Sequence, residues 1–173
     1  MSGAAAYLEA LSVDEARAAL LSCCGSTRWV DEMLAARPYA GDDGLFEAAE
    51  AAWGGLGEAD WREAFAGHPR IGDRGQGSAG SPASTRSAAW SRQEQTGASE
   101  AAEETLRSLA QGNQEYEDRF GHVFLICATG RSALEMLAAL RRRMTNDPET
   151  ELQVAAGEQA RITRLRLEKL TKP

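Results

Sequence analysis

The sequence lacks several features that would assign it to a class at once. It has only 3 cysteines, and Cys23, Cys24 and Cys127 show neither metal-site spacing nor an even disulfide framework. Reduced thiols, typical of a cytoplasmic protein, are therefore expected. We find no basic segment of the kind that opens a signal peptide, and no apolar run long enough to span a bilayer.

Positive charge is also scarce. The formal net charge is −7 at pH 7, which makes nucleic acids and anionic membranes poor candidates as partners. An anionic ligand would have to be bound by local positive groups. The 173 residues are enough for one domain with its own core, so we expect residues 1–173 to form a single domain.

Strand-like alternation is absent, whereas helical periodicity recurs, and the predicted fold is all-α: a single-domain bundle of about eight helices. Ser12 and Glu15 form a capping box at the start of one helix. The expected helices cover residues 12–21, 29–37, 45–53, 58–66, 100–120, 132–144 and 149–170, with another starting near residue 90.

Two segments interrupt this pattern. Residues 72–89 are rich in Gly and Ser and predict a functional or disordered loop, with an interdomain linker as the alternative. The apolar run 123–128 predicts either a buried extended segment or the start of the next helix. An extended segment would leave backbone groups available to a planar, amide-rich ligand, although protein groups could satisfy them equally well.

His68 is the first candidate for chemistry. Residues 58–66 predict a helix that Gly67 ends, and Pro69 restricts His68 to an extended conformation. The imidazole is therefore presented just past a helix end on a stiff backbone, which suits a general acid or base. A plain loop histidine is the alternative.

Two further candidates depend on helical spacing. Ser91, Glu94 and Gln95 stand at i, i+3 and i+4, so a hydroxyl, a carboxylate and an amide would share one face; Ser-x-x-Glu is equally a capping box. Arg166 falls inside the apolar arc of the last helix, where it would need an anion: a substrate, or a structural carboxylate. A side chain that reaches the rim is also possible.

Other distinctive residues have plainer interpretations. His122 is expected to be structural, and Glu158 is expected to lie outside the apolar arc of its helix. The run Arg141, Arg142, Arg143 is expected to form a solvated helix face. The tryptophans are expected in the core rather than against a ligand, at Trp29, Trp53, Trp61 and Trp90.

Taken together, these motifs resemble a known family. His-Pro-Arg-Ile-Gly, Ser-x-x-Glu-Gln, Asn-x-x-Tyr-x-x-Arg-Phe-Gly, Phe-Leu-Ile-Cys-Ala and a late Leu-Arg-Leu follow one another in order. This series closely resembles the OHCU decarboxylases, which act on 2-oxo-4-hydroxy-4-carboxy-5-ureidoimidazoline in urate breakdown. The resemblance extends from about Tyr7 to Leu170.

The resemblance implies a cofactor-free carboxy-lyase that forms (S)-allantoin, is all-helical and usually homodimeric, and has no metal. It places the proton-transfer group on His68, an orienting or acid-base carboxylate on Glu94, and the anion-binding group on Arg166. Substrate-binding positions carried over in the same way are Pro69, Ser91, Arg92, Gln93, Glu94, Gln95, Phe124, Leu125, Ile126, Cys127 and Ala128.

Two other function classes remain open at this stage. One is a non-catalytic helical partner module of a urate-pathway enzyme, which His68 and Glu94 within hydrogen-bond reach would argue against. The other is a hydrolase of ureido compounds on the same scaffold. A hydrolase would need an activated water, and the sequence shows no cluster of metal ligands to activate one.

Overall fold

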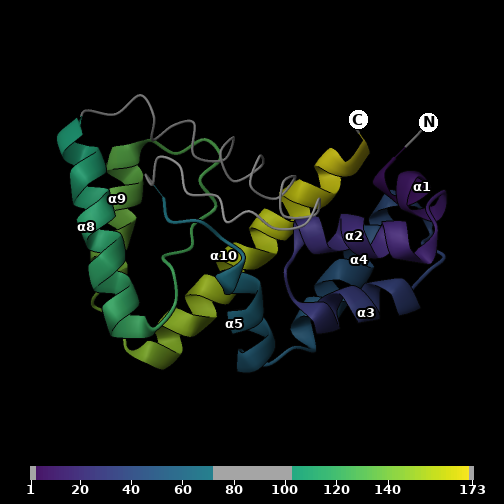
Figure 1. Cartoon of the computed structure of the whole chain (residues 1–173), viewed down its shortest axis with the longest axis horizontal. Helices are drawn as coiled ribbons and strands as arrows, with labels where there is room; N and C mark the ends of the chain where they lie inside the picture. The colour runs from purple at the N-terminus through teal and green to yellow at the C-terminus, as the bar shows by residue number, and fades with distance from the viewer. Residues whose placement is uncertain (1–2, 72–102, 172–173) are drawn as a thin grey trace.

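The computed structural model describes residues 3–71 and 103–171. These residues form eight α-helices and one short 3₁₀ helix, with no strand among them (Figure 1). The all-α prediction is confirmed. None of the described helices is long and apolar enough to cross a membrane.

The first half of the described chain packs five helices around one apolar core. They are α1 (Ala4–Glu9), α2 (Val13–Cys23), α3 (Thr27–Ala35), α4 (Gly41–Gly54) and α5 (Glu58–Ala66). The predicted capping box is present, because Glu15 N–H donates to Ser12 and Ser12 N–H donates to Glu15. Leu8, Leu20, Trp29, Met33 and Leu45 are fully buried in this core. Helix α1 was not among the expected helices.

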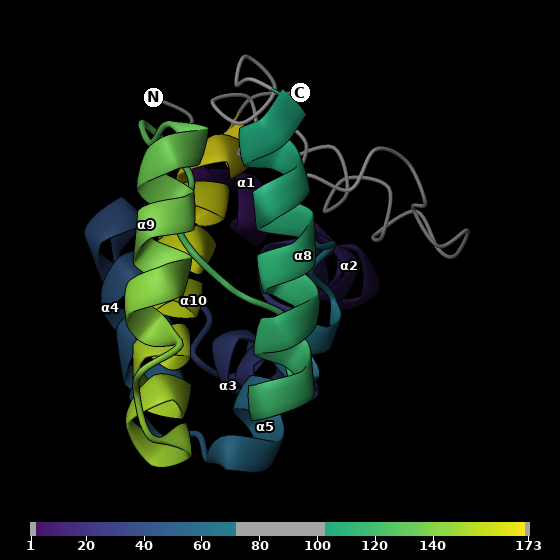
Figure 2. The same ribbon diagram turned by 90° about the vertical axis from the view of Figure 1, so that its left-hand side faces the viewer.

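Helices α8 (Glu103–Phe120) and α9 (Ala133–Arg143) form a pair that runs side by side in the same direction (Figures 1 and 2). Gly121 ends α8 as predicted, with a φ of 72° that favours glycine. The chain then returns along the pair, and residues 123–128 have no regular secondary structure. Of the two predictions for this run, the extended segment is confirmed.

Helix α10 (Pro148–Glu168) crosses the molecule diagonally and joins the two halves; the 3₁₀ helix η1 (Lys169–Thr171) follows it. It packs against α2, α4 and α5 on one side and against α8 on the other. Asp147 caps its first turn, and Pro148 occupies a position where the missing N–H is not needed. Its central turns therefore lie where the two halves meet.

Candidate active site

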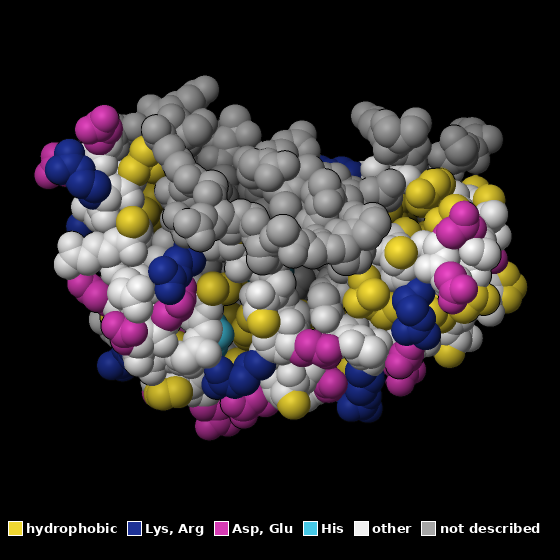
Figure 3. Space-filling model, viewed as in Figure 1, with side chains coloured by type: hydrophobic (Ala, Val, Ile, Leu, Met, Phe, Trp, Pro, Cys, Tyr) yellow, Lys and Arg dark blue, Asp and Glu magenta, His cyan; other side chains and the backbone are white. Residues whose placement is uncertain are grey.

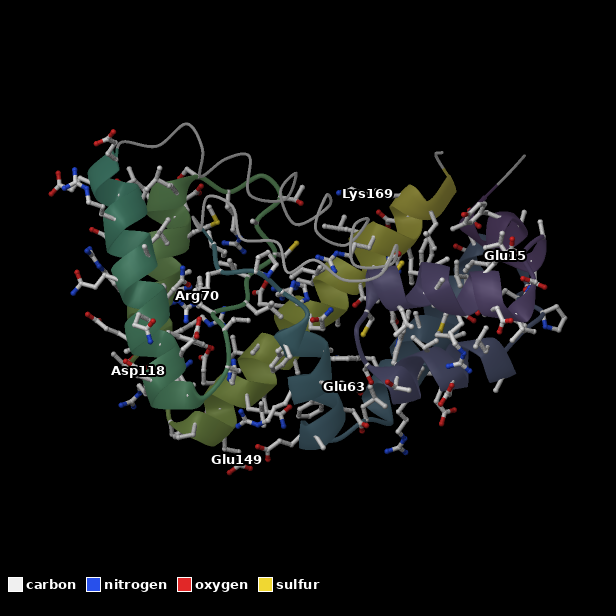
Figure 4. All side chains as sticks on the ribbon, viewed as in Figure 1. Glu15, Glu63, Arg70, Asp118, Glu149 and Lys169 are labelled. Atoms are coloured by element: carbon white, nitrogen blue, oxygen red, sulfur yellow. The ribbon has the colours of Figure 1, made fainter. Side chains whose placement is uncertain are left out.

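The end of α5 presents His68 as the sequence predicts. Gly67 caps the helix, and the backbone N–H of His68 donates to Phe65 O at 3.0 Å. The segment that follows is tied to α8: Arg70 makes a two-pronged ion pair with Glu117 at 2.6 and 2.8 Å, and Asn113 donates to Ile71 O at 2.8 Å. Figure 4 shows Arg70 between the end of α5 and α8. The backbone on both sides of His68 is thereby held.

The half-buried imidazole of His68 contacts the middle of α10. Its Nε2 lies 2.8 Å from Oε1 of Gln159, which is fully buried. Burial and, to a smaller extent, the nearby charge of Arg166 lower the pKa of His68 from 6.5 to about 3, against the opposing effect of the Gln159 hydrogen bond. A neutral imidazole at physiological pH can accept a proton, as a general base must.

Arg166 lies inside α10, as predicted from its place on the apolar arc. Its side chain is 2% exposed, and its charge acts on both His68 and Cys24. Gln159, Thr163 and Arg166 stand at i, i+4 and i+7, so one face of the helix carries all three buried polar groups. His68 and Arg166, nearly 100 positions apart in the sequence, belong to one site.

The extended segment 123–128 is held from outside by side chains. Cys127 N–H donates to Glu158 at 2.8 Å, and Cys127 O accepts from Arg131 at 3.2 Å. Glu158 falls outside the apolar arc of α10, as expected, yet it is only 8% exposed. The apolar side chains of α10 mark only part of the helix surface that is buried. The segment 123–128 covers Glu158 as well, and the Glu158 carboxylate accepts from a backbone N–H of that segment.

A buried ion pair holds the same segment at a second point. Arg143 donates to Leu125 O at 2.7 Å and to Glu151 at 2.7 Å, and Glu151 also accepts from Tyr116 and from Asn146. The prediction of a solvated arginine run is therefore wrong for Arg143, which is 5% exposed, although Arg141 and Arg142 are exposed. A buried guanidinium is tolerated here because a carboxylate and a carbonyl both accept from it.

His122 has the surroundings of a structural histidine. Its ring lies 5.1 Å from Phe65 and 5.4 Å from Tyr116, centroid to centroid, and its Nδ1 is 3.1 Å from Val123 O. Of the tryptophans, Trp29 is fully buried in the core. Trp53 and Trp61 are half-buried and pack against the same core.

Several predicted site residues cannot be placed. Ser91, Arg92, Gln93, Glu94 and Gln95 lie outside the described residues, as do Trp90 and the Gly/Ser-rich loop. Pro69 is exposed beside His68. Phe124, Leu125, Ile126 and Ala128 are buried in the extended segment, and Cys127 is half-buried. Within the described ranges, no group of three or more His, Cys, Asp or Glu side chains could hold a metal ion.

Sequence reasoning missed Gln159 and Thr163. The signal that could have found them is their spacing, since they share the face on which Arg166 was recognised. A separate cavity of about 460 Å³ between α4 and α10 is lined mainly by apolar side chains such as Phe46 and Trp53. No predicted site residue lines that cavity, so we place the candidate site at His68.

Comparison with known proteins gives a consistent result. A family model described as OHCU decarboxylase matches residues 9–168. The uric acid degradation bifunctional protein TTL of Arabidopsis thaliana is 36% identical over 148 residues, which cover 86% of this chain and 45% of that protein. A 2-oxo-4-hydroxy-4-carboxy-5-ureidoimidazoline decarboxylase of Amia calva is 41% identical over 56 residues, 32% of each chain. The matches thus span less than half the length of these curated relatives.

Two solved structures are similar in fold. The crystal structure of OHCU decarboxylase in the presence of (S)-allantoin has a TM-score of 0.74 at 35% identity, covering 87% of this chain and 95% of that chain. The crystal structure of (S)-allantoin synthase has a TM-score of 0.64 at 19% identity, covering 92% and 51%. The second likeness supports the fold alone.

Proposed function

The chain belongs to the OHCU decarboxylase family, and we propose that it converts 2-oxo-4-hydroxy-4-carboxy-5-ureidoimidazoline to (S)-allantoin without a cofactor. The observation that carries this proposal is the joint placement of two groups. A neutral imidazole, His68, lies within the electrostatic reach of a buried guanidinium, Arg166. A decarboxylase needs both, because one group must move a proton and another must bind an anionic substrate.

The chemistry can proceed on the substrate's own atoms. When the bond from the ring carbon to the carboxylate breaks, CO2 leaves and the bonding electron pair forms a ring C=C bond. The electron pair of the conjugated C=N moves to nitrogen, which takes up a proton from solvent. The resulting enol loses its hydroxyl proton, and the neighbouring ring carbon gains one. Delivery of that proton by fixed groups to one face would set the hand of the product.

We assign His68 to the proton transfer and Arg166 to the substrate's anionic group. The buried arginine suits an anion because desolvation strengthens its electrostatic interaction. Glu94 is proposed as the orienting or acid-base partner of His68. Pro69, Ser91, Arg92, Gln93 and Gln95 are proposed to contact the substrate together with the extended segment 124–128.

The backbone of that segment is a suitable cradle for the ureido and ring amide groups. Leu125 O and both backbone polar groups of Cys127 are already bonded to protein side chains. These bonds fix the segment's rotation about its own axis, and hence the directions of its remaining N–H and C=O groups. A preorganised set of such groups binds a planar amide-rich ligand with little loss of entropy.

The proposal also covers assembly and location. We propose a homodimer in the cytoplasm. The reducing compartment is supported by Cys23 and Cys24, which are neighbours in the chain and both buried but form no disulfide. Light scattering of the purified protein would measure the assembly directly.

The test uses the two histidines as a matched pair. Freshly oxidised urate, treated with a hydrolase for its first oxidation product, is supplied with and without the protein while optical activity follows allantoin. His68→Ala should lower turnover by about two to four orders of magnitude with unchanged helical circular dichroism. His122→Asn, which keeps a donor near Val123 O, should remain active. Racemic product with the wild-type protein, at the uncatalysed rate, would contradict the proposed function.

A further inference from the structure

A buried chain of hydrogen bonds leads from His68 to the opposite side of α10. Gln159 Oε1 lies 2.8 Å from Nε2 of His68, and Gln159 Nε2 donates to Thr163 Oγ1 at 3.0 Å. Thr163 in turn lies within hydrogen-bonding reach of Cys24, the residue that caps α2, and lowers the pKa of its thiol. Gln159 and Cys24 are fully buried and Thr163 is 4% exposed, so each member of the chain depends on its neighbours for hydrogen bonding.

The chain has a preferred direction. A hydroxyl has one proton, and the thiol of Cys24 is a weak donor whose sulfur already accepts from the Ser26 backbone. The stronger arrangement has Thr163 O–H directed at the sulfur and Thr163 Oγ1 accepting from the Gln159 amide. The opposite direction would require the thiol to donate to Thr163, which is the weakest of the available bonds.

This direction determines which end of the Gln159 amide faces His68. With its N–H₂ group occupied by Thr163, the amide presents its carbonyl oxygen to the imidazole. A carbonyl oxygen can only accept, so Nε2 of His68 must carry the proton. Neutral imidazole has a single N–H, and Nδ1 is therefore left with its lone pair. Among the described residues, no group hydrogen-bonds to Nδ1.

We propose that Gln159, oriented by Thr163 and Cys24, is a positioning residue that fixes His68 in the Nε2–H tautomer and leaves Nδ1 as the basic atom. The assignment of Nδ1 as the atom that accepts the substrate proton rests on the proposed function. The tautomer itself is a property of the free protein. Gln159 acts through His68 and does not need to touch the substrate.

Thr163→Val is the variant that tests the chain, because it replaces the hydroxyl by a methyl of similar shape. In its present orientation the Gln159 amide would then have an N–H group without an acceptor, because Thr163 Oγ1 is gone. If the amide group turned by 180°, its C=O would face the valine and lack a donor. An unpaired buried carbonyl is tolerated better than an unpaired N–H, so the amide is expected to rotate. It would then donate to Nε2 of His68 and favour the Nδ1–H tautomer. Thr163→Ser keeps the hydroxyl and is the matched control.

The tautomer is read by NMR of protein carrying nitrogen-15-labelled histidine, without substrate. The chain has 2 histidines, and His122→Asn assigns the signals of His68. In the wild type and in Thr163→Ser, Nε2 of His68 should be the protonated nitrogen and Nδ1 the unprotonated one. In Thr163→Val the protonated signal should move to Nδ1, and kcat should fall at least about tenfold, a part of what general-base catalysis supplies.

The outcomes separate this inference from the proposed function. An Nδ1–H tautomer in the wild type, or an unchanged tautomer in Thr163→Val that still folds with helical circular dichroism, would overturn the positioning role. The Nε2–H tautomer in a wild-type protein that does not decarboxylate would overturn the proposed function and leave the tautomer assignment supported. A tautomer change in Thr163→Val with unaltered kcat would overturn Nδ1 as the catalytic base.

Discussion

At the scale of single residues, the site combines a group made neutral by burial with a group that keeps its charge. His68 is held by Gln159 and has a pKa of about 3, and Arg166 contributes to that lowering. Two positive charges in one buried site would repel each other, so the arginine's charge favours the neutral imidazole. This electrostatic coupling keeps the imidazole neutral beside a charged guanidinium.

The lowered pKa of His68 predicts how stability depends on pH. In the unfolded chain the imidazole binds a proton below about pH 6.5, whereas in the folded protein it does so only near pH 3. The unfolded state thus binds more protons between these values, and His68 makes the free energy of unfolding fall as pH decreases from 6.5. The slope contributed by this one group is at most about 1.4 kcal/mol per pH unit.

Urea unfolding between about pH 5 and 6.5 measures this slope, in a range above most carboxylate titrations. His68→Gln removes the titrating group and should flatten the curve relative to the wild type. The pKa of His122 is also lowered by burial, so some slope should persist in the variant. Identical slopes in the two proteins would mean that His68 is not held neutral by the fold.

Arg166→Met should raise the pKa of His68 and abolish substrate use. The guanidinium charge lowers the pKa of the imidazole, and a methionine keeps much of the stem without that charge. Because desolvation remains the largest cause, the pKa should still lie below 6.5. An NMR titration of His68 measures the shift. Arg164→Met is the control, because Arg164 lies on the exposed side of the same helix and pairs with Glu168. It should change neither the pKa of His68 nor substrate use.

At the scale of elements, the extended segment 123–128 depends on the helices around it. Helix α9 supplies Arg143, which donates to Leu125 O, and α10 supplies Glu158, which accepts from Cys127 N–H. The segment runs beside the pair α8 and α9, on the side that faces α10 (Figure 1). Isolated from these helices, the segment would have neither strand neighbours nor helical hydrogen bonds to satisfy its backbone.

Arg143→Met should destabilise the protein strongly. Glu151 would remain buried with its charge no longer matched by the guanidinium, and Leu125 O would lose its donor. Removal of one partner from a buried ion pair typically lowers the free energy of unfolding by about 3–5 kcal/mol. The neighbouring Arg142 is exposed, and Arg142→Met should change the free energy of unfolding by less than about 0.5 kcal/mol.

Urea unfolding of both arginine variants, followed by tryptophan fluorescence, makes the comparison. Equal stability of Arg143→Met and Arg142→Met would show that the buried pair contributes nothing to the fold. If Arg143→Met folds, its turnover should also fall, because the extended segment loses one of its fixed points. Arg142→Met should keep full turnover.

At the scale of the whole molecule, α10 organises the protein by joining two helical units with separate apolar cores. A third, smaller apolar cluster, which includes Phe65, Leu125 and Ile162, fills the junction. The end of α5, which carries His68, and the part of α10 that His68 contacts lie at the same junction. The outer surface mixes acidic and basic side chains on the face seen in Figure 3, without a patch of one sign.

Activity of the whole protein should survive removal of metal ions. The substrate carries its own electron sink in the ring C=N, so neither a Lewis acid nor a metal-activated water is needed. Turnover after exhaustive treatment with EDTA, measured as optically active allantoin, should equal that of untreated protein. Loss of activity that zinc or magnesium restores would contradict the cofactor-free mechanism.

Much of this protein could be determined from the sequence alone. Apolar periodicity and capping residues act within a few positions, so the helices, the capping box at Ser12 and the end of α8 at Gly121 were predictable. The stiff presentation of His68 and the burial of Arg166 were predictable for the same reason. Each follows from near neighbours or from the phase of a single helix.

Only the tertiary structure decided which other polar residues are buried and what they bind. Arg143 is the same residue type as its exposed neighbours Arg141 and Arg142, so the local sequence does not distinguish it. Its burial depends on Glu151 and on Leu125 O, which come from other parts of the chain. Glu158 and Gln159 are likewise defined by their partners Cys127 and His68. A hydrogen bond between elements distant in the sequence leaves no local periodicity, because both partners must first be brought together by packing.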